Sequence, residues 1–236
     1  MTKQELVEKL AKELVSAGGH FGYAKARRHP STKPSLYSVK SGKDIIDINK
    51  TVEQVEKAAD FLAKIVADKK QFLTIGTKPE ARAEVTNFGL KLLMPYSGDR
   101  FIGGTLTNFG EIKKRVEKMH ELIAKKEKGE FSVYTKKEQV LIDRDIARMT
   151  KNFGGLSVVT NLPAAVLLVD NKHEAISQAE AKYMRLPVVA ISNTDCNIKE
   201  VAYPIVMNDT SATAIQIVLD YLAQRIESAG EVAMNA

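Results

Sequence analysis

Three aspartates follow apolar runs that are expected to be strands, where carboxylates can take part in acid–base or metal chemistry. Asp170, Asp195 and Asp209 would lie at the carboxyl edge of a parallel sheet, the usual ligand-binding edge of such folds. Their surroundings have no metal-ligand spacing, and aspartate also caps helices, so capping is the competing interpretation. We therefore expect no catalytic residue, no metal, no cofactor and no small-molecule substrate.

A glycine turn, Gly76-Thr-Lys78, comes after an apolar run and before an expected helix. Such a turn can hold a phosphate on the amides of the helix N-terminus. It lacks the spacing of either common glycine-rich nucleotide fingerprint, so a tight strand-to-helix turn is the competing interpretation. Lys78 can also meet an RNA phosphate directly. The alternative function is a nucleotide- or phosphate-binding α/β enzyme or receiver domain, built around Gly76, Lys78 and Asp170.

A second turn, Gly103-Gly-Thr-Leu-Thr-Asn108, places two glycines before three polar side chains. The glycines let the backbone approach a sugar-phosphate chain closely, and Thr105, Thr107 and Asn108 can donate hydrogen bonds to it. Helix capping by Thr107 or Asn108 is a further interpretation, and the two roles are compatible.

Basic residues are concentrated early in a chain whose net charge is only +6. Residues 1–100 carry 18 basic and 12 acidic side chains, whereas residues 156–236 carry 5 and 9. The segment 20–43 contains no acid and six cations: Lys25, Arg27, Arg28, Lys33, Lys40 and Lys43. A segment with only positive charges attracts a polyanion such as RNA, because each phosphate that it neutralises releases counterions. A solvated basic loop is the competing interpretation, and a protein scaffold without RNA is disfavoured by this segment.

A single cysteine, Cys196, permits no internal disulfide and no cysteine-based zinc cluster. No stretch reaches the roughly 20 apolar residues of a membrane span, and the first helix is amphipathic rather than signal-like. We therefore expect a cytoplasmic protein without a membrane partner.

Short apolar runs alternate with helical patterns, which predicts an α/β fold with a doubly wound parallel sheet. Strands are expected at 44–48, 72–75, 165–169, 187–191 and 202–206, with a short one near 36–39. Helices are expected at the start of the chain, ended by Gly18-Gly19, and at 51–67, 81–93, 173–184 and 212–226. The basic segment between them is expected to be mainly loop.

Between the two α/β parts lie two apolar series with the 4, 3, 4 spacing of a coiled-coil seam. They are Ile112, Val116, Met119 and Ile123, and Ile142, Ile146, Met149 and Phe153. The spacing predicts an antiparallel α-helical coiled-coil hairpin that turns near Gly129. Its charged outer faces favour an arm for a partner over a packed helical layer. The expected division is an α/β core at 1–106 and 156–228, a hairpin insertion at 107–155 and a flexible tail at 229–236.

Several segments together resemble the bacterial small-subunit ribosomal protein two family. They occur in the family's order along almost the whole chain: Ala17-Gly-Gly-His-Phe-Gly22, Asp44-Ile-Ile-Asp-Ile-Asn-Lys-Thr51, Arg100-Phe-Ile-Gly-Gly-Thr-Leu-Thr-Asn108, Phe153-Gly-Gly-Leu156, Pro187-Val-Val-Ala-Ile191 and Tyr203-Pro-Ile205. Departures from the family pattern include Arg28, where an aromatic residue is common, and Phe101, where tryptophan is usual.

The resemblance implies a flavodoxin-like core with a protruding helical hairpin. It also implies a structural, non-enzymatic protein that binds small-subunit ribosomal RNA, joins the subunit late in assembly and lies near other small-subunit proteins, possibly ribosomal protein one. From the residues we expect RNA contacts, mainly to phosphates, from one set of side chains: Lys25, Arg27, Arg28, Lys33, Lys40, Lys78, Arg82, Arg100, Thr105, Thr107, Asn108, Lys113 and Lys114.

Overall fold

A parallel sheet of five strands lies at the centre of the protein, whose computed structural model describes residues 3–234. The strand order is β5-β4-β6-β7-β8, and every neighbouring pair is parallel. The strands are β4 (Phe72–Ile75), β5 (Tyr96–Ser97), β6 (Ala165–Val169), β7 (Val188–Ser192) and β8 (Tyr203–Val206). This is the flavodoxin-like order, in which the chain changes direction across the sheet between β4 and β6. The predicted fold class is confirmed.

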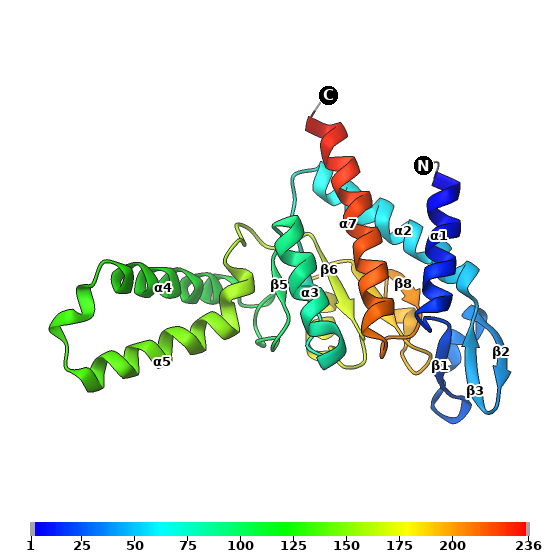
Figure 1. Cartoon of the computed structure of the whole chain (residues 1–236), viewed down its shortest axis with the longest axis horizontal. Coiled ribbons are helices and arrows are strands. Elements are labelled where there is room, and N and C mark those ends of the chain that lie inside the picture. The colour runs from blue at the N-terminus through cyan, green and yellow to red at the C-terminus, as the bar shows by residue number, and fades with distance from the viewer. Residues whose placement is uncertain (1–2, 235–236) are drawn as a thin grey trace.

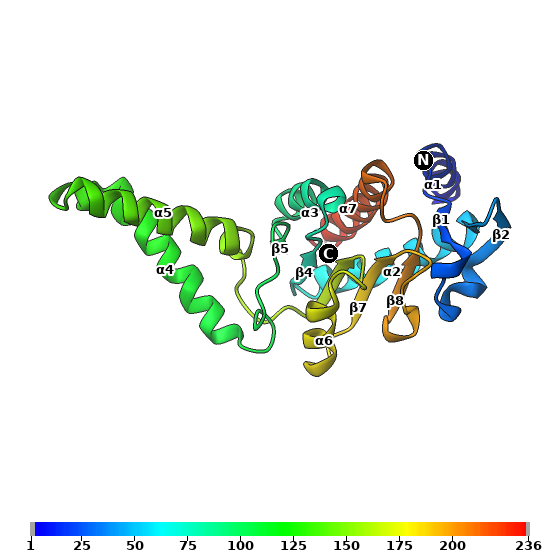
Figure 2. The same cartoon turned by 90° about the horizontal axis from the view of Figure 1, so that it is seen from below.

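Helices cover both faces of the sheet, which explains why the central strands are apolar throughout. Every residue of β6 and β7 is buried. In β6, Leu167 and Val169 pack toward one face, and Val166 and Leu168 toward the other. The first face carries α1 (Lys3–Ser16), α2 (Ile48–Ala67), α3 (Pro79–Leu92) and α7 (Ala212–Met234), and the second carries α6 (Ala175–Tyr183). Figure 2 shows α3 and α7 on one side of the sheet and α6 on the other.

The early part of the chain forms a separate antiparallel sheet, which contains the strands expected near 36–39 and at 44–48 and a further strand, β1, that was expected to be loop. Its order is β1-β3-β2, from β1 (Phe21–Ala24), β2 (Leu36–Lys40) and β3 (Lys43–Ile46). The strand expected to reach residue 48 ends at Ile46, because Asp47 accepts a hydrogen bond from the Asn49 amide and caps α2. Two 3-10 turns, Lys25–Arg27 and Pro30–Ser35, occupy the basic segment between β1 and β2.

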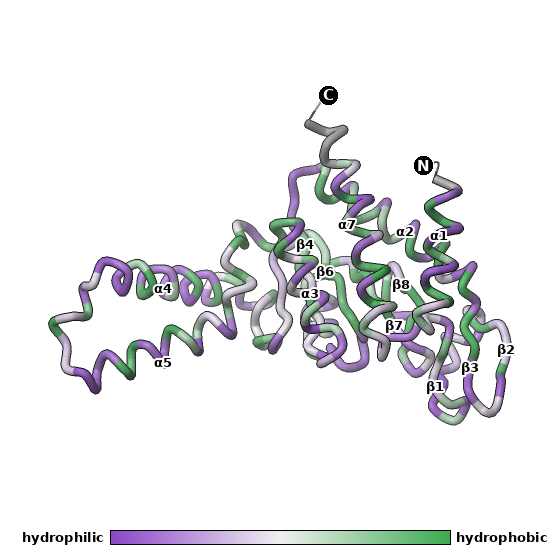
Figure 3. Tube along the Cα trace, viewed as in Figure 1, coloured by the Kyte–Doolittle hydropathy of each residue, from purple (hydrophilic) through white to green (hydrophobic). Residues whose placement is uncertain are grey.

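The hairpin insertion consists of α4 (Phe109–Glu127) and α5 (Lys136–Phe153), linked by the 3-10 turn Glu130–Val133. It projects from one end of the core, whereas the antiparallel sheet lies at the other end (Figure 1). Figure 3 shows mainly hydrophobic strands in the core and alternating polar and apolar residues along α4 and α5.

A coiled-coil seam along the whole hairpin is not confirmed. Ile112, Val116 and Met119 of α4 are buried against the second face of the sheet, together with Phe153 of α5. Ile142 and Ile146, farther along α5, are only half-buried. The apolar spacing therefore serves to attach the root of the arm to the core, and the outer part of the arm is more open.

The last helix is longer than expected, since α7 continues to Met234 rather than ending near residue 226. Residues 229–234, expected to be a flexible tail, are therefore helical, and residues 235–236 lie outside the described part. No helix among residues 3–234 has the length and apolar character needed to cross a membrane.

Candidate nucleic-acid interface

The basic segment is held on the carboxyl edge of the parallel sheet by the loop that follows β7. Thr194 in that loop accepts hydrogen bonds at its side chain from the Tyr23 amide (3.0 Å) and at its carbonyl from the His29 amide (2.8 Å). Thr32 donates a further bond to the same carbonyl over 2.9 Å. A Cβ at Gly22 would lie 2.6 Å from the Thr194 methyl carbon, so glycine permits this close approach. The segment is thus a docked part of the fold.

Three of its lysines, Lys25, Lys33 and Lys40, are exposed to solvent. In the part of the chain that the structure describes, none of them has a carboxylate within ion-pair distance. Their positive charges are therefore available to an external anion, as the sequence predicts.

The two neighbouring arginines differ in their surroundings. Arg27 packs 4.1 Å above the Tyr23 ring and forms an ion pair of 3.2 Å with Asp195, yet 57% of its side chain is exposed. The Arg28 guanidinium is paired with Asp44, whose side chain is fully buried, and its Nε donates to Asp44 Oδ2 over 2.9 Å. Arg28 therefore mainly stabilises the fold through Asp44. Of the two arginines, Arg27 is the one that can contact an external anion.

Lys78 lies inside an ion triad at the carboxyl edge of the sheet. Its ammonium is 2.7 Å from Asp170 Oδ2 and 2.6 Å from Asp209 Oδ2, and only 14% of its side chain is exposed. Burial opposes the charge on Lys78, but hydrogen bonds to the two carboxylates outweigh it and raise the pKa of Lys78 above its ordinary value. Burial also opposes the charge on Asp170, yet the bond from Lys78 lowers the pKa of that carboxyl, whereas burial raises the pKa of Asp209.

The triad accounts for two of the three aspartates that follow the strands. Next to it, the Thr77 amide and hydroxyl donate to Glu174 over 2.8 and 2.6 Å. The position where a flavodoxin-like sheet usually binds ligand is thus filled by the protein's own charged groups. Within residues 3–234 no group of three or more His, Cys, Asp or Glu side chains is arranged to hold a metal ion. Burial raises the pKa of the Cys196 thiol, which disfavours the thiolate form of this side chain.

The turn at 103–108 surrounds a carboxylate of the protein itself. Glu180 of α6 accepts hydrogen bonds from the amides of Gly104 (2.6 Å), Leu106 (3.0 Å) and Thr107 (3.2 Å). Gly104 has φ +92, which favours glycine and lets its amide take part. Thr105 is buried and donates to the Ile102 carbonyl, while the Asn108 side chain makes no capping bond. The amides expected to approach a sugar-phosphate chain therefore fasten the arm to α6.

Replacing Glu180 with alanine is expected to lower the free energy of unfolding by about 1.5–3 kcal/mol, since it leaves three amides without their charged acceptor. Amide hydrogen exchange at residues 104, 106 and 107 should accelerate in the same variant. Glu180→Gln retains one acceptor oxygen and should lose less. Unchanged exchange at these amides in Glu180→Ala would show that Glu180 does not anchor the arm.

The remaining expected contacts lie near the root of the arm. Arg82 forms a half-exposed ion pair with Asp99 at 3.2 Å, and Arg100 is exposed. The Lys113 ammonium donates to the Thr160 carbonyl over 3.3 Å, and Lys114 pairs with Glu111 within α4 at 2.7 Å. These four cations belong to the arm end of the protein, so the structure separates them from Lys25, Arg27, Lys33 and Lys40.

One cation near the basic segment, Lys172, was not among the RNA-contacting residues expected from the sequence. Lys172 follows β6 and approaches Asp195, the residue that also pairs with Arg27. Its position just after a strand end, beside Asp170, was the available signal, but the shared partner Asp195 is 23 positions from Lys172 and 168 positions from Arg27 in the chain. Only the folded chain shows that they meet.

Comparisons with known proteins agree on one family. A family model described as "Ribosomal protein S2" matches residues 14–229. The "Small ribosomal subunit protein uS2" of Karelsulcia muelleri (strain GWSS) is 35% identical over 214 residues, which cover 91% of this chain and 96% of that protein. The protein of the same name from Dehalococcoides mccartyi (strain CBDB1) is 36% identical over 215 residues, covering 91% and 88%. That from Christiangramia forsetii (strain DSM 17595 / CGMCC 1.15422 / KT0803) is 38% identical over 215 residues, covering 91% and 72%.

Proposed function

The chain belongs to the ribosomal protein S2 family, and on this premise we propose that it is a structural protein of the small ribosomal subunit that binds ribosomal RNA mainly through phosphates. Its working location is then the small subunit in the cytoplasm. RNA of this kind is recognised largely through its shape and its backbone, which suits a surface of cations more than a base-reading pocket.

The observation that carries the proposal is the group of exposed lysines on the docked basic segment. Lys25, Lys33 and Lys40 are exposed; the segment around Lys25 and Lys33 is tied to the sheet through Thr194, and Lys40 is held in β2 by its pairing with β3. Because the segment is already ordered by these bonds, less conformational entropy is lost when it meets RNA. Exposed cations on an ordered backbone favour binding to a folded polyanion over mere solvation.

The arm supplies a second proposed contact, well separated from the first. The cations at its root and along α4 lie at the opposite end of the core from the antiparallel sheet (Figure 1). A single protein of this shape can therefore contact two RNA surfaces and fix their separation. This geometry supports a structural role between parts of the subunit.

The alternative, an enzyme or receiver for a phosphorylated ligand, depended on Gly76, Lys78 and Asp170. Lys78 and Asp170 are bonded to each other, and the ammonium also contacts Asp209. A ligand phosphate would have to displace a buried carboxylate from Lys78, and this disfavours the alternative.

The triple variant Lys25→Ala, Lys33→Ala, Lys40→Ala is expected to bind small-subunit ribosomal RNA with a reduced salt dependence. The slope of log affinity against log salt should fall by about 3, or about 1 for each lost phosphate contact, with little change in thermal stability. Filter binding between about 50 and 200 mM KCl measures the slope.

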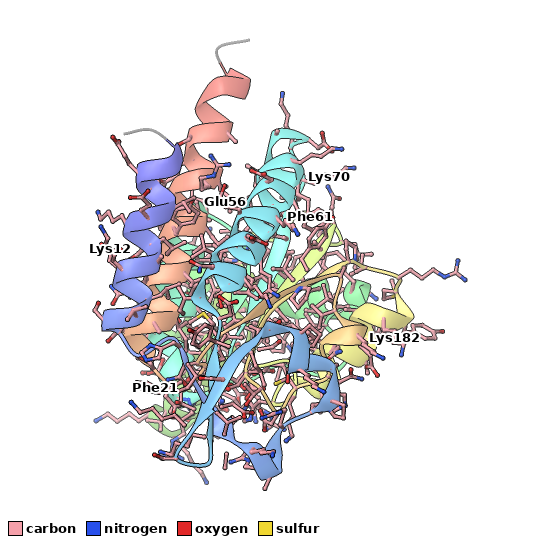
Figure 4. The ribbon with its side chains drawn as sticks, turned by 90° about the vertical axis from the view of Figure 1, so that its right-hand side faces the viewer. Lys12, Phe21, Glu56, Phe61, Lys70 and Lys182 are labelled. Atoms are coloured by element: carbon pink, nitrogen blue, oxygen red, sulfur yellow. The ribbon has the colours of Figure 1, made fainter. Side chains whose placement is uncertain are left out.

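The matched control removes three exposed lysines, Lys12, Lys64 and Lys70, from α1, α2 and the turn after α2. Figure 4 shows Lys12 on α1 and Lys70 after α2, both above Phe21, which begins β1. The control should leave the slope near that of the wild type. If both triple variants lower it equally, the basic segment is not the RNA-binding surface.

A further inference from the structure

Two cations from distant parts of the chain are held by one carboxylate oxygen. Asp195 Oδ2 is 3.2 Å from the Arg27 guanidinium and 2.8 Å from the Lys172 ammonium. Because both groups reach the same oxygen, their nitrogen atoms lie within about 6 Å of each other. Two like charges at this separation repel, so the carboxylate between them is what holds them together.

The carboxylate is fixed and the cations are open to solvent. Only 5% of the Asp195 side chain is exposed, against 57% for Arg27 and 59% for Lys172. Asp195 lies in the loop between Thr194, which binds the basic segment, and Cys196, which is fully buried. The Tyr23 ring, 4.1 Å from the Arg27 guanidinium carbon, restrains the arginine from a second direction.

The local charge suits a phosphodiester. Two cations and one carboxylate leave one net positive charge, and the hydrogen bond to Asp195 raises the pKa of Lys172 so that its ammonium stays protonated. By contrast, the nearby triad of Lys78, Asp170 and Asp209 is net negative and nearly closed to solvent. The carboxyl edge thus has one closed charged cluster and one open one.

We propose that Arg27 and Lys172 form a clamp for a phosphate of the bound RNA, and that Asp195 is the positioning residue of this clamp. The inference rests on the proposed function and extends it, since it adds Lys172 to the interface and gives an acidic residue a role in binding an anion. It also extends the interface from the basic segment across the carboxyl edge of the parallel sheet.

The first test compares two lysines of the chain's later half. Lys172→Ala should lower the log–log salt slope for small-subunit ribosomal RNA by about 1. Lys182→Ala removes the same charge from α6, at an exposed position on the far side from Phe21 in Figure 4, and should leave the slope unchanged. Equal slopes for Lys172→Ala and the wild type would overturn the clamp.

The second test uses Asp195→Asn, for which charge and positioning predict opposite results. If the acid only reduces the positive charge, its removal should tighten RNA binding. If it positions Arg27 and Lys172, the variant should bind more weakly, and adding Lys172→Ala to it should weaken binding less than in the wild-type background. Tighter binding by Asp195→Asn would overturn the positioning role.

The two proposals fail in different ways. Wild-type protein whose affinity for the RNA does not depend on salt would contradict the proposed function as a whole. Normal salt dependence in the wild type, with loss of slope in the triple lysine variant but none in Lys172→Ala, would contradict the clamp alone. Circular dichroism and thermal unfolding of each variant exclude loss of fold as the cause.

Discussion

Lys78→Ala is expected to lower the free energy of unfolding by about 3–5 kcal/mol at about pH 7, the largest stability loss that we predict for one exchange of a lysine. The variant leaves the carboxylates of Asp170 and Asp209, with side chains 10% and 1% exposed, beside each other and without their cation. Breaking a buried ion pair costs more than the pair contributes, because the remaining charge stays desolvated. Urea denaturation measures the change, with the exposed Lys182→Ala as the control for removal of a lysine.

The same variant should respond to pH in a defined direction. Without the ammonium, the pKa of the two carboxyls in the folded state rises above the unfolded value of about 3.9, so folding takes up a proton. The stability deficit relative to the wild type should therefore shrink as the pH falls from about 7 toward about 4. In the wild type the pKa of Lys78 is raised, so its contribution is complete below its ordinary pKa and is lost as the pH rises above it. A deficit that grows on acidification would contradict the triad.

Arg28→Ala is expected to cost a similar 3–5 kcal/mol, because it leaves the fully buried Asp44 carboxylate without its partner. Asp44 belongs to β3, the central strand of the antiparallel sheet, so the loss should appear as faster amide exchange in β1 and β2 as well. Denaturant unfolding and residue-resolved exchange measure the two effects.

The neighbouring Arg27→Ala serves as the matched control, since Arg27 is more than half exposed and its removal should change stability by less than about 1 kcal/mol. RNA binding by the folded proteins should show the reverse order. Arg27→Ala should reduce the slope of log affinity against log salt more than Arg28→Ala does. Adding Asp44→Asn to Arg28→Ala should recover part of the stability, because the buried charge is removed with its partner. Equal stability of the two arginine variants would show that the Arg28–Asp44 pair has no structural role.

Much of the fold could be predicted from local patterns. Phe72–Ile75 and Ala165–Val169 are strands with the expected bounds, because a short, largely apolar run that is too brief for a helix is typical of a strand covered on both faces. The apolar spacing in α4 correctly predicted a helix that buries Ile112, Val116 and Met119. It did not reveal what they pack against, because a 4, 3, 4 spacing describes one face of a helix and not its partner.

The antiparallel sheet could be predicted only in part from local patterns. The sequence indicated strands near β2 and β3, but β1 (Phe21–Ala24) was expected to be loop, because its four residues are exposed or half-buried and show no clear alternation. Their pairing depends on hydrogen bonds between strands and on the distant residue Thr194.

The sequence by itself determined the α/β class, the helical arm, the family and the place where positive charge gathers, because each depends on residue types close together in the chain. Tertiary structure alone decided which of those charges remain open. It joined Lys78 to Asp170 and Asp209, Arg28 to Asp44, and Arg27 to Asp195 and Lys172. An ion pair requires two side chains to meet within about 4 Å, and partners that lie 16 to 168 positions apart in the chain meet only when the backbone has folded.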